Sequence, residues 1–117
     1  MRPIVVDIPG LHLVSEANRA SHEHWRVRQK RAKAQRACVG LHVRACFGGS
    51  NITLPLKVTI FRIGPRRLDW DNAVGSAKHT IDAVAKELGV NDNDPRISWD
   101  VQQEKGPYAV RIRIEAA

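Results

Sequence analysis

The chain has 117 residues, 43% of them hydrophobic and 26% charged, which argues against disorder over its whole length and leaves little room for a second domain. Lys and Arg number 19 against 12 Asp and Glu, so the formal net charge is +7. Small, strongly basic domains commonly bind polyanions, and the composition therefore favours a nucleic-acid partner.

Positive charge is concentrated in the first half of the chain. Residues 1–67 hold 13 Lys and Arg against 3 Asp and Glu, whereas residues 68–117 hold 6 against 9. Nucleic-acid binding beside a metal site would explain this division. Cys38 and Cys46 have neither the spacing of a zinc site nor that of a disulfide framework. Since there is also no long apolar run and no signal-peptide core, we expect a soluble, cytoplasmic protein without a membrane partner.

The first three elements follow from apolar patterning and composition. Alternation over residues 4–8 predicts a short strand, which a Pro-Gly pair ends. The stretch 22–45 lacks proline and is rich in Ala, Arg, Lys and Gln, which predicts a helix with Ser21 as a candidate N-cap. The first part of residues 56–63 alternates as in a half-buried strand.

The second helix has the clearest pattern. Apolar residues recur at helical spacing between residues 74 and 88 and mark one buried face. Asp71 or Asn72 can cap its start, and Gly89 can cap its end. We therefore predict one continuous helix over residues 71–88.

The end of the chain is predicted to be a hairpin. Residues 97–101 and 108–114 both alternate as strands do, and a Lys-Gly-Pro turn joins them. The expected fold is a single α+β domain over residues 1–117, in β-α-β-α-β-β order, with two main helices and a mixed sheet, or an antiparallel one.

Two carboxylates, Asp69 and Asp71, precede the second helix. In an extended segment, residues two apart point to the same side, so these side chains would project together. Mg²⁺ prefers such oxygen ligands, and the neighbouring Arg66 and Arg67 would attract phosphate. The plainer alternative is that the two carboxylates are a helix cap and a surface charge.

A third candidate group lies within the helix itself. At 100° per residue, Asp71, Lys78 and Asp82 fall within about 40° of one another, and Gly75 lies near the same line. Lys78 could hold a scissile phosphate or stabilise the leaving oxygen. It could equally be a boundary lysine whose stem covers the core edge.

An acidic loop follows, with Asp92 and Asp94. A helix over residues 71–88 is about 27 Å long, so the loop cannot reach Asp71 from the far end. The loop must fold back, the next strand must return towards Asp71, or a second chain must supply the carboxylate. Asp92 and Asp94 could also be plain turn formers.

The chemistry-bearing residues form a recognisable series along residues 66–106. The series consists of Asp69-Trp70-Asp71-Asn72, Lys78, Asp82-Ala83, Leu88-Gly89-Val90-Asn91-Asp92, Arg96-Ile97-Ser98-Trp99 and Gln103-Glu104-Lys105-Gly106. This series resembles the RusA family of Holliday junction resolvases, in its bacterial and prophage branch. The interval before Lys78 is longer than in the best-known members, and Asn91 stands where many members have Asp.

The resemblance implies a Mg²⁺-dependent homodimer, with Mn²⁺ as an alternative ion and no organic cofactor. Such an enzyme cuts four-way DNA junctions by paired nicks during recombination and repair. The implied metal ligands are Asp69, Asp71 and Asp92, with Asp94 as a competitor for the third role. The implied catalytic lysine is Lys78.

The basic run between residues 26 and 36 is a candidate DNA-binding surface. It contains no acidic residue, which favours contact with DNA over a merely solvated helix. The expected DNA contacts are Arg26, Lys30, Lys33, Arg66 and Arg67. Two other functions remain open: a non-catalytic nucleic-acid-binding domain, and a metal-dependent nuclease that acts on flaps or other branched substrates.

Overall fold

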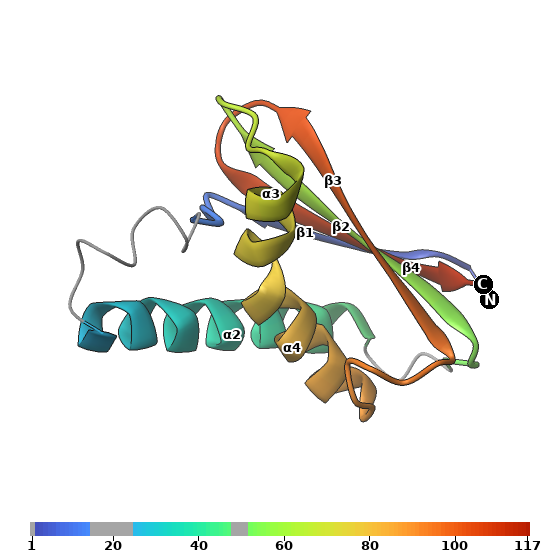
Figure 1. Cartoon of the computed structure of the whole chain (residues 1–117). Helices are drawn as coiled ribbons and strands as arrows, with labels where there is room; N and C mark the ends of the chain where they lie inside the picture. The colour runs from blue at the N-terminus through green and yellow to red at the C-terminus, as the bar shows by residue number, and fades with distance from the viewer. Residues whose placement is uncertain (1, 15–24, 48–51) are drawn as a thin grey trace.

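Four strands form one mixed sheet and three helices pack against it in the part of the chain that the computed structural model describes, residues 2–14, 25–47 and 52–117 (Figure 1). The elements are β1 (Ile4–Pro9), α2 (Trp25–Phe47), β2 (Leu56–Gly64), α3 (Trp70–Ser76), α4 (Lys78–Leu88), β3 (Ile97–Lys105) and β4 (Ala109–Ala116). The predicted α+β class and the order of strands and helices are confirmed. The proposed cap Ser21 lies outside the described residues.

The strands are arranged in the order β1-β4-β2-β3. Strand β2 pairs in parallel with β3 on one side and antiparallel with β4 on the other, and β1 completes the sheet beside β4. The predicted terminal hairpin is therefore wrong, because β2 lies between β3 and β4. The connection crosses the end of β2, where the Gly106 amide donates a 3.0 Å hydrogen bond to the Gly64 carbonyl.

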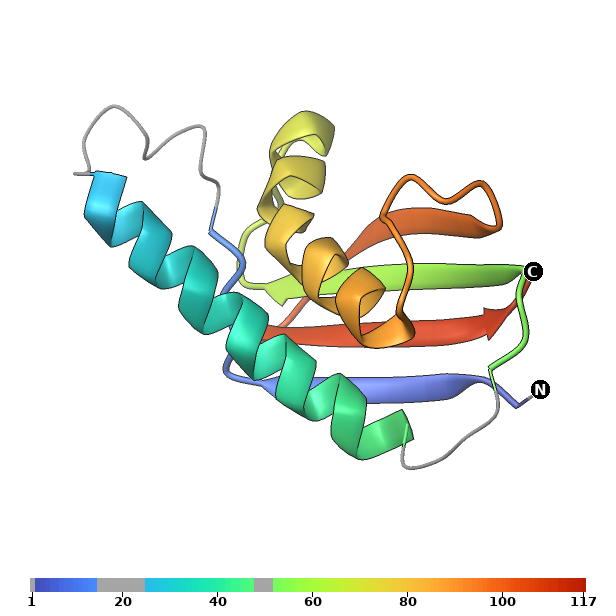
Figure 2. The same ribbon diagram turned by 90° about the horizontal axis from the view of Figure 1, so that it is seen from below.

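The hydrophobic core lies between the sheet and the helices. Alternate residues on each strand point towards the helices, and Val58, Ile60 and Ile112 are fully buried there. Figure 2 shows α2 and α4 crossing this face of the sheet. On the opposite face, Lys57 is exposed as expected of a half-buried strand, but Thr59 and Phe61 are buried. The half-buried prediction for β2 fails there because side chains of a neighbouring strand cover this face: the Arg113 guanidinium on β4 lies over the Phe61 ring at 5.3 Å.

Helix α2 reaches the core through a stripe of small or slender side chains. Its buried residues are Ala32, Gln35, Val39, Gly40 and Val43, spaced at helical intervals along one face. A Cβ atom at Gly40 would lie 3.3 Å from the Glu87 carboxylate on α4, so this position is suited to glycine. The apolar pattern of α2 is weak in the sequence because only this narrow stripe, which consists largely of small residues, packs against the core.

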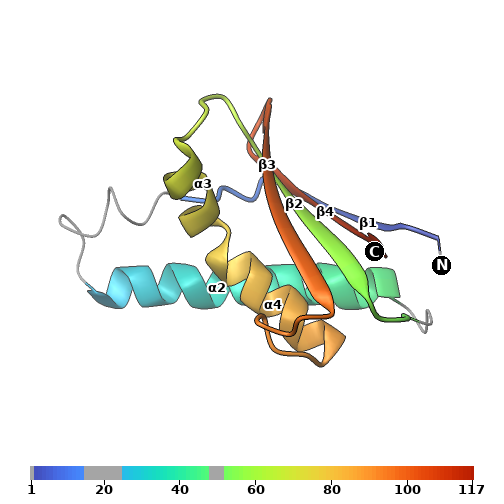
Figure 3. The same cartoon turned by 45° about the vertical axis from the view of Figure 1, so that its right-hand side comes forward.

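The predicted single helix over residues 71–88 is in fact two helices. Helix α3 ends at Ser76, Ala77 has φ −89° and ψ −4°, and α4 begins at Lys78 (Figure 3). The Ser76 hydroxyl donates a 2.7 Å hydrogen bond to the Ala73 carbonyl, which weakens helical continuity there. At the other end, Gly89 adopts the left-handed conformation with φ 73°, which confirms it as the C-cap.

The three helices lie on one side of the sheet, as Figure 3 shows, and the other side carries no helix within residues 2–14, 25–47 and 52–117. In those same ranges, no helix combines the length and the apolar character needed to cross a membrane.

Candidate functional site

The first part of the candidate site is the start of α3. Asp69 is the N-cap residue, and its carbonyl accepts a 2.8 Å hydrogen bond from the Ala73 amide. Its carboxylate makes no capping hydrogen bond, and Asp71 lies exposed in the first helical turn. Thus the cap is neither Asp71 nor Asn72, and residues 69–71 are not an extended segment. Both carboxylates nevertheless lie at a helix N-terminus, where negative charge is favoured.

Gln103 holds the residue that precedes Asp69. Its side-chain carbonyl accepts a hydrogen bond from the Leu68 amide, and its side-chain NH₂ donates to the Leu68 carbonyl, both at 2.8 Å. The side-chain amide of Gln103 thus satisfies both the N–H and the carbonyl of Leu68, as the main chain of a neighbouring strand would do. Because Gln103 lies near the end of β3, the returning strand fixes the entry to α3.

A buried arginine, Arg62, ties down the segment that carries Arg66 and Arg67. It is 4% exposed and donates hydrogen bonds to the Leu13 carbonyl at 3.2 Å and the Arg66 carbonyl at 3.0 Å. Burial lowers the pKa of the Arg62 guanidinium. The exposed side chains of Arg66 and Arg67 therefore project from a fixed main chain beside Asp69.

Neither Arg62 nor Gln103 was given a role from the sequence, although Gln103 belongs to the series that carries the resemblance. A signal was present, because each is a polar residue at an inward-facing position of a strand whose other inward residues are apolar. A polar group in such a place must find a hydrogen-bond partner, and here each side chain finds one in the segment before α3, Arg62 at Arg66 and Gln103 at Leu68.

The acidic loop before β3 contains one engaged carboxylate and one exposed carboxylate. Asp94 accepts hydrogen bonds from the Arg96 amide at 2.9 Å and from the Arg96 guanidinium at 3.0 and 2.7 Å. These bonds lower the pKa of Asp94 to about 2. Asp92 is exposed, and only its main-chain carbonyl is engaged, by the Trp99 indole at 2.9 Å. Of the two candidates for the third metal ligand, Asp92 is therefore the one whose carboxylate is not bound by an arginine among the described residues.

The predicted metal ligands are not all brought together. Among the residues that the structure describes, no group of three or more His, Cys, Asp or Glu side chains is placed to hold a metal ion. The entry to Asp69 is tied to the end of β3 through Gln103, whereas Asp92 is tied to its beginning through Trp99. Mg²⁺ commonly uses only one or two carboxylates and keeps several waters, so Asp69 and Asp71 fit its donor preference without a third ligand.

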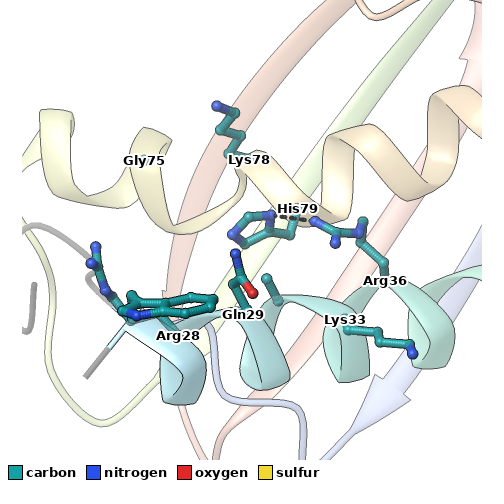
Figure 4. A pocket seen from close by; sticks show the side chains of 9 residues that line it. Arg28, Gln29, Lys33, Arg36, Gly75, Lys78 and His79 are labelled. Carbon is teal, nitrogen blue, oxygen red and sulfur yellow. Dashed lines mark hydrogen bonds between the residues drawn. The ribbon is translucent and has the colours of Figure 1, made fainter. Parts of the chain in front are cut away.

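The second part of the candidate site is a cationic hollow of about 670 Å³ between α2 and the junction of α3 with α4, which we call the basic groove (Figure 4). It is lined by Trp25, Arg28, Gln29, Ala32, Lys33, Arg36, Gly75, Lys78 and His79. A Cβ atom at Gly75 would meet open space, so the approach to the groove is unobstructed there. The groove brings Lys78 together with the basic helix, which the sequence did not predict.

Side chains from both walls meet inside the basic groove. The Arg36 guanidinium and the His79 ring are 3.1 Å apart and joined by a hydrogen bond, drawn as a dashed line in Figure 4. Of the predicted DNA contacts on α2, only Lys33 lines the groove. Arg26 instead lies over the Trp25 ring at 5.4 Å, and Lys30 is exposed elsewhere on the helix.

The helix break changes the relation between Asp71, Lys78 and Asp82. A helical wheel assumes one axis, and the axis is interrupted at Ala77. The predicted alignment of the three residues on one helix face is therefore wrong. Lys78 becomes the first residue of α4 and borders the basic groove, while Asp71 stays at the far end of α3.

Comparison with known proteins adds no family assignment: the chain matches no protein-family model, and no curated protein matches its sequence significantly. What the chain does must therefore be inferred from the residues of the candidate site and from the family resemblance of residues 69–106.

Proposed function

We propose that this chain is a Mg²⁺-dependent endodeoxyribonuclease of the RusA type, which resolves four-way DNA junctions in the cytoplasm. The observation that carries the proposal is the pair of exposed carboxylates, Asp69 and Asp71, at the N-terminus of α3, with Arg66 and Arg67 three and two residues before Asp69. Support also comes from the basic groove at the opposite end of α3, which offers cations for the DNA backbone.

Each group has a role suited to its surroundings. Asp69 and Asp71 would hold Mg²⁺, because neither carboxylate is engaged by a cation in the described structure and both are hard oxygen ligands. Arg66 and Arg67 would hold the phosphate beside them through charge-assisted hydrogen bonds. Gln103 and Arg62 keep the main chain on either side of this segment in place.

When bound, Mg²⁺ would neutralise charge on the phosphate and activate water for its hydrolysis. Lys78 would contribute positive charge near the cut strand from the start of α4. Asp92 is the preferred third carboxylate, because Asp94 is already occupied by Arg96. The homodimer that the resemblance implies would allow a second chain to supply Asp92, and paired nicks would require two such sites.

One observation favours a second candidate, a nucleic-acid-binding domain without catalytic activity. The described residues do not assemble three metal ligands in one chain. In that case the basic groove would bind DNA and the acidic residues would serve only the start of α3 and the turn before β3. The two candidates differ in strand scission, since both predict binding.

The test is cleavage of a labelled four-way junction beside a linear duplex of matched sequence, in Mg²⁺ or in EDTA. The proposal expects Mg²⁺-dependent, symmetric nicks confined to the junction. Cleavage of flaps and junctions at equal rates would favour a nuclease of broader substrate range. Tight binding of the junction without scission in Mg²⁺ or Mn²⁺ would favour the non-catalytic domain.

A further inference from the structure

The groove between α2 and the α3–α4 junction has a chemistry of its own. We infer that the basic groove binds the phosphodiester backbone of a single-stranded DNA segment, with Lys33, Arg36 and Arg28 contacting phosphates. The inference deepens the proposed function and depends on it only for the choice of DNA as the polyanion. It names a binding site distinct from the carboxylates at the start of α3.

The cations that line the basic groove occupy one face of α2. Arg28, Gln29, Ala32, Lys33 and Arg36 recur at intervals of three and four residues, so their side chains point the same way. Arg28 and Arg36 are eight residues apart, which places them about 12 Å apart along the helix axis. A row of charges of this length can contact successive phosphates of one strand, whereas a single phosphate would leave part of it unused.

None of the described residues that line the basic groove is acidic, and this distinguishes it from the hollow that adjoins it. The adjoining hollow, of about 420 Å³, continues between α2 and α4 and includes Glu87. There the Glu87 carboxylate binds the Arg44 guanidinium at 2.6 Å. Arg44 is therefore paired with a carboxylate in the adjoining hollow, whereas the described residues that line the basic groove offer none to Arg28, Lys33 or Arg36, and a polyanion would supply negative charge there.

One polar atom in the groove wall lacks a hydrogen-bond partner. The Nε of Arg28 is buried and makes no hydrogen bond within the described structure. Buried polar groups of this kind normally have a partner, and a guanidinium group is well suited to a phosphate oxygen. A phosphate bound in the groove would provide that partner after a change of the Arg28 rotamer that exposes the Nε.

The shape and the aromatic content of the groove favour one strand over a duplex. The groove is a concave hollow between two helices, as Figure 4 shows, whereas the phosphates of a duplex lie on a convex surface and would reach only the rim. Trp25, which is 50% exposed, lines the same hollow as the cations. Cations that follow a backbone, together with an aromatic ring for base stacking, are typical of single-strand binding sites.

The experiment measures fluorescence anisotropy of a labelled 20-nucleotide dT strand in EDTA, over a range of salt concentrations. The groove variant is Lys33→Gln with Arg36→Gln, because both side chains are exposed and their loss should leave the fold intact. The control variant is Lys57→Gln with Arg2→Gln, which removes the same charge from exposed positions that line neither the basic groove nor the adjoining hollow. Thermal unfolding of each variant verifies that it is folded.

Each phosphate contact on a single strand contributes about 0.7 to the slope of log affinity against log salt, which corresponds to roughly five- to tenfold in affinity at 50 mM salt. The groove variant should therefore bind about 50-fold more weakly, with a slope shallower by about 1.4. Arg28→Gln alone should lose roughly five- to tenfold. The control variant should stay within about threefold of the wild type, since its two substituted cations lie outside the basic groove.

Equal losses in the groove and control variants would overturn the inference, because they would show only a general effect of net charge. Unchanged binding in both variants would overturn it as well. A duplex of the same length that binds as tightly and is weakened as much by the groove variant would contradict the single-strand assignment. Because these measurements are made in EDTA, they do not depend on strand scission: failure to cut junctions would leave the groove result intact, and the reverse also holds.

Discussion

The side chain of Gln103 makes a structural contact whose contribution can be measured. It exchanges two 2.8 Å hydrogen bonds with the main chain of Leu68, directly before Asp69. Gln103→Leu keeps the size of the side chain but removes both bonds and leaves a half-buried amide and carbonyl without that partner. We expect the variant to be less stable and to hold the start of α3 less firmly.

The magnitude follows from the hydrogen bonds lost. Each bond contributes about 0.5–1.5 kcal/mol net, and water can replace part of the loss because Leu68 is only half-buried. The free energy of unfolding should therefore fall by about 1–2 kcal/mol. In urea unfolding followed by circular dichroism, the midpoint should drop by about 0.5–1 M with an unchanged slope.

Gln102→Leu is the matched control for this prediction. Gln102 is the adjacent glutamine on the exposed face of β3, and its side chain binds only the nearby Asp100. Its replacement should change the free energy of unfolding by less than about 0.5 kcal/mol. If the two variants lost the same stability, or if Gln103→Leu lost none, the claim that Gln103 holds the entry to α3 would be wrong.

Further predictions concern two glycines and one ion pair. Gly89→Ala should destabilise the protein by about 1 kcal/mol because of its positive φ, whereas Gly75→Ala should stabilise α3 by about 0.5–1 kcal/mol, and thermal unfolding distinguishes the two signs. In the folded protein, Arg96 lowers the pKa of Asp94 from 3.8 to about 2, so the contribution of this pair is fully present above about pH 4 and is lost as the pH falls towards 2. In urea unfolding, Asp94→Asn should therefore be less stable than the wild type at pH 6, and the difference should shrink as the pH approaches 2.

The sequence was sufficient for those parts of the fold that depend on local pattern. Strand alternation located β1, β3 and β4, and Gly89 was correctly identified because few other residues adopt a positive φ at a helix end. Alternation reports which face of a strand is buried but does not report its neighbour in the sheet. For this reason the hairpin was wrongly predicted, although the strand positions were correct.

The break at Ala77 could not be read from apolar spacing, because the buried faces of α3 and α4 continue the same sequence period. The break depends on the Ser76 back-bond and on how each helix packs against its own part of the molecule. The prediction from spacing alone therefore placed Lys78 in line with Asp71 instead of on the wall of the basic groove.

The basic groove could not be predicted from the sequence, since it joins α2 to residues at least 39 positions further along the chain. The basic run was evident from composition, but the choice among its cations requires knowledge of the helix face that meets α4. Of the DNA contacts predicted on α2, Lys33 lines the groove and its contact with DNA stays a prediction, while Arg28 and Arg36 line the groove and were not named individually.

The central claim is that Asp69 and Asp71 hold the metal ion that permits DNA cleavage. The most direct test compares cleavage of a labelled four-way junction in Mg²⁺ by the wild type, Asp71→Asn and Asp94→Asn, with junction binding measured in parallel. The account predicts that Asp71→Asn loses at least about 100-fold in cleavage while it still binds the junction, and that Asp94→Asn retains cleavage. Equal cleavage by the wild type and Asp71→Asn, or none by any of the three proteins, would contradict it.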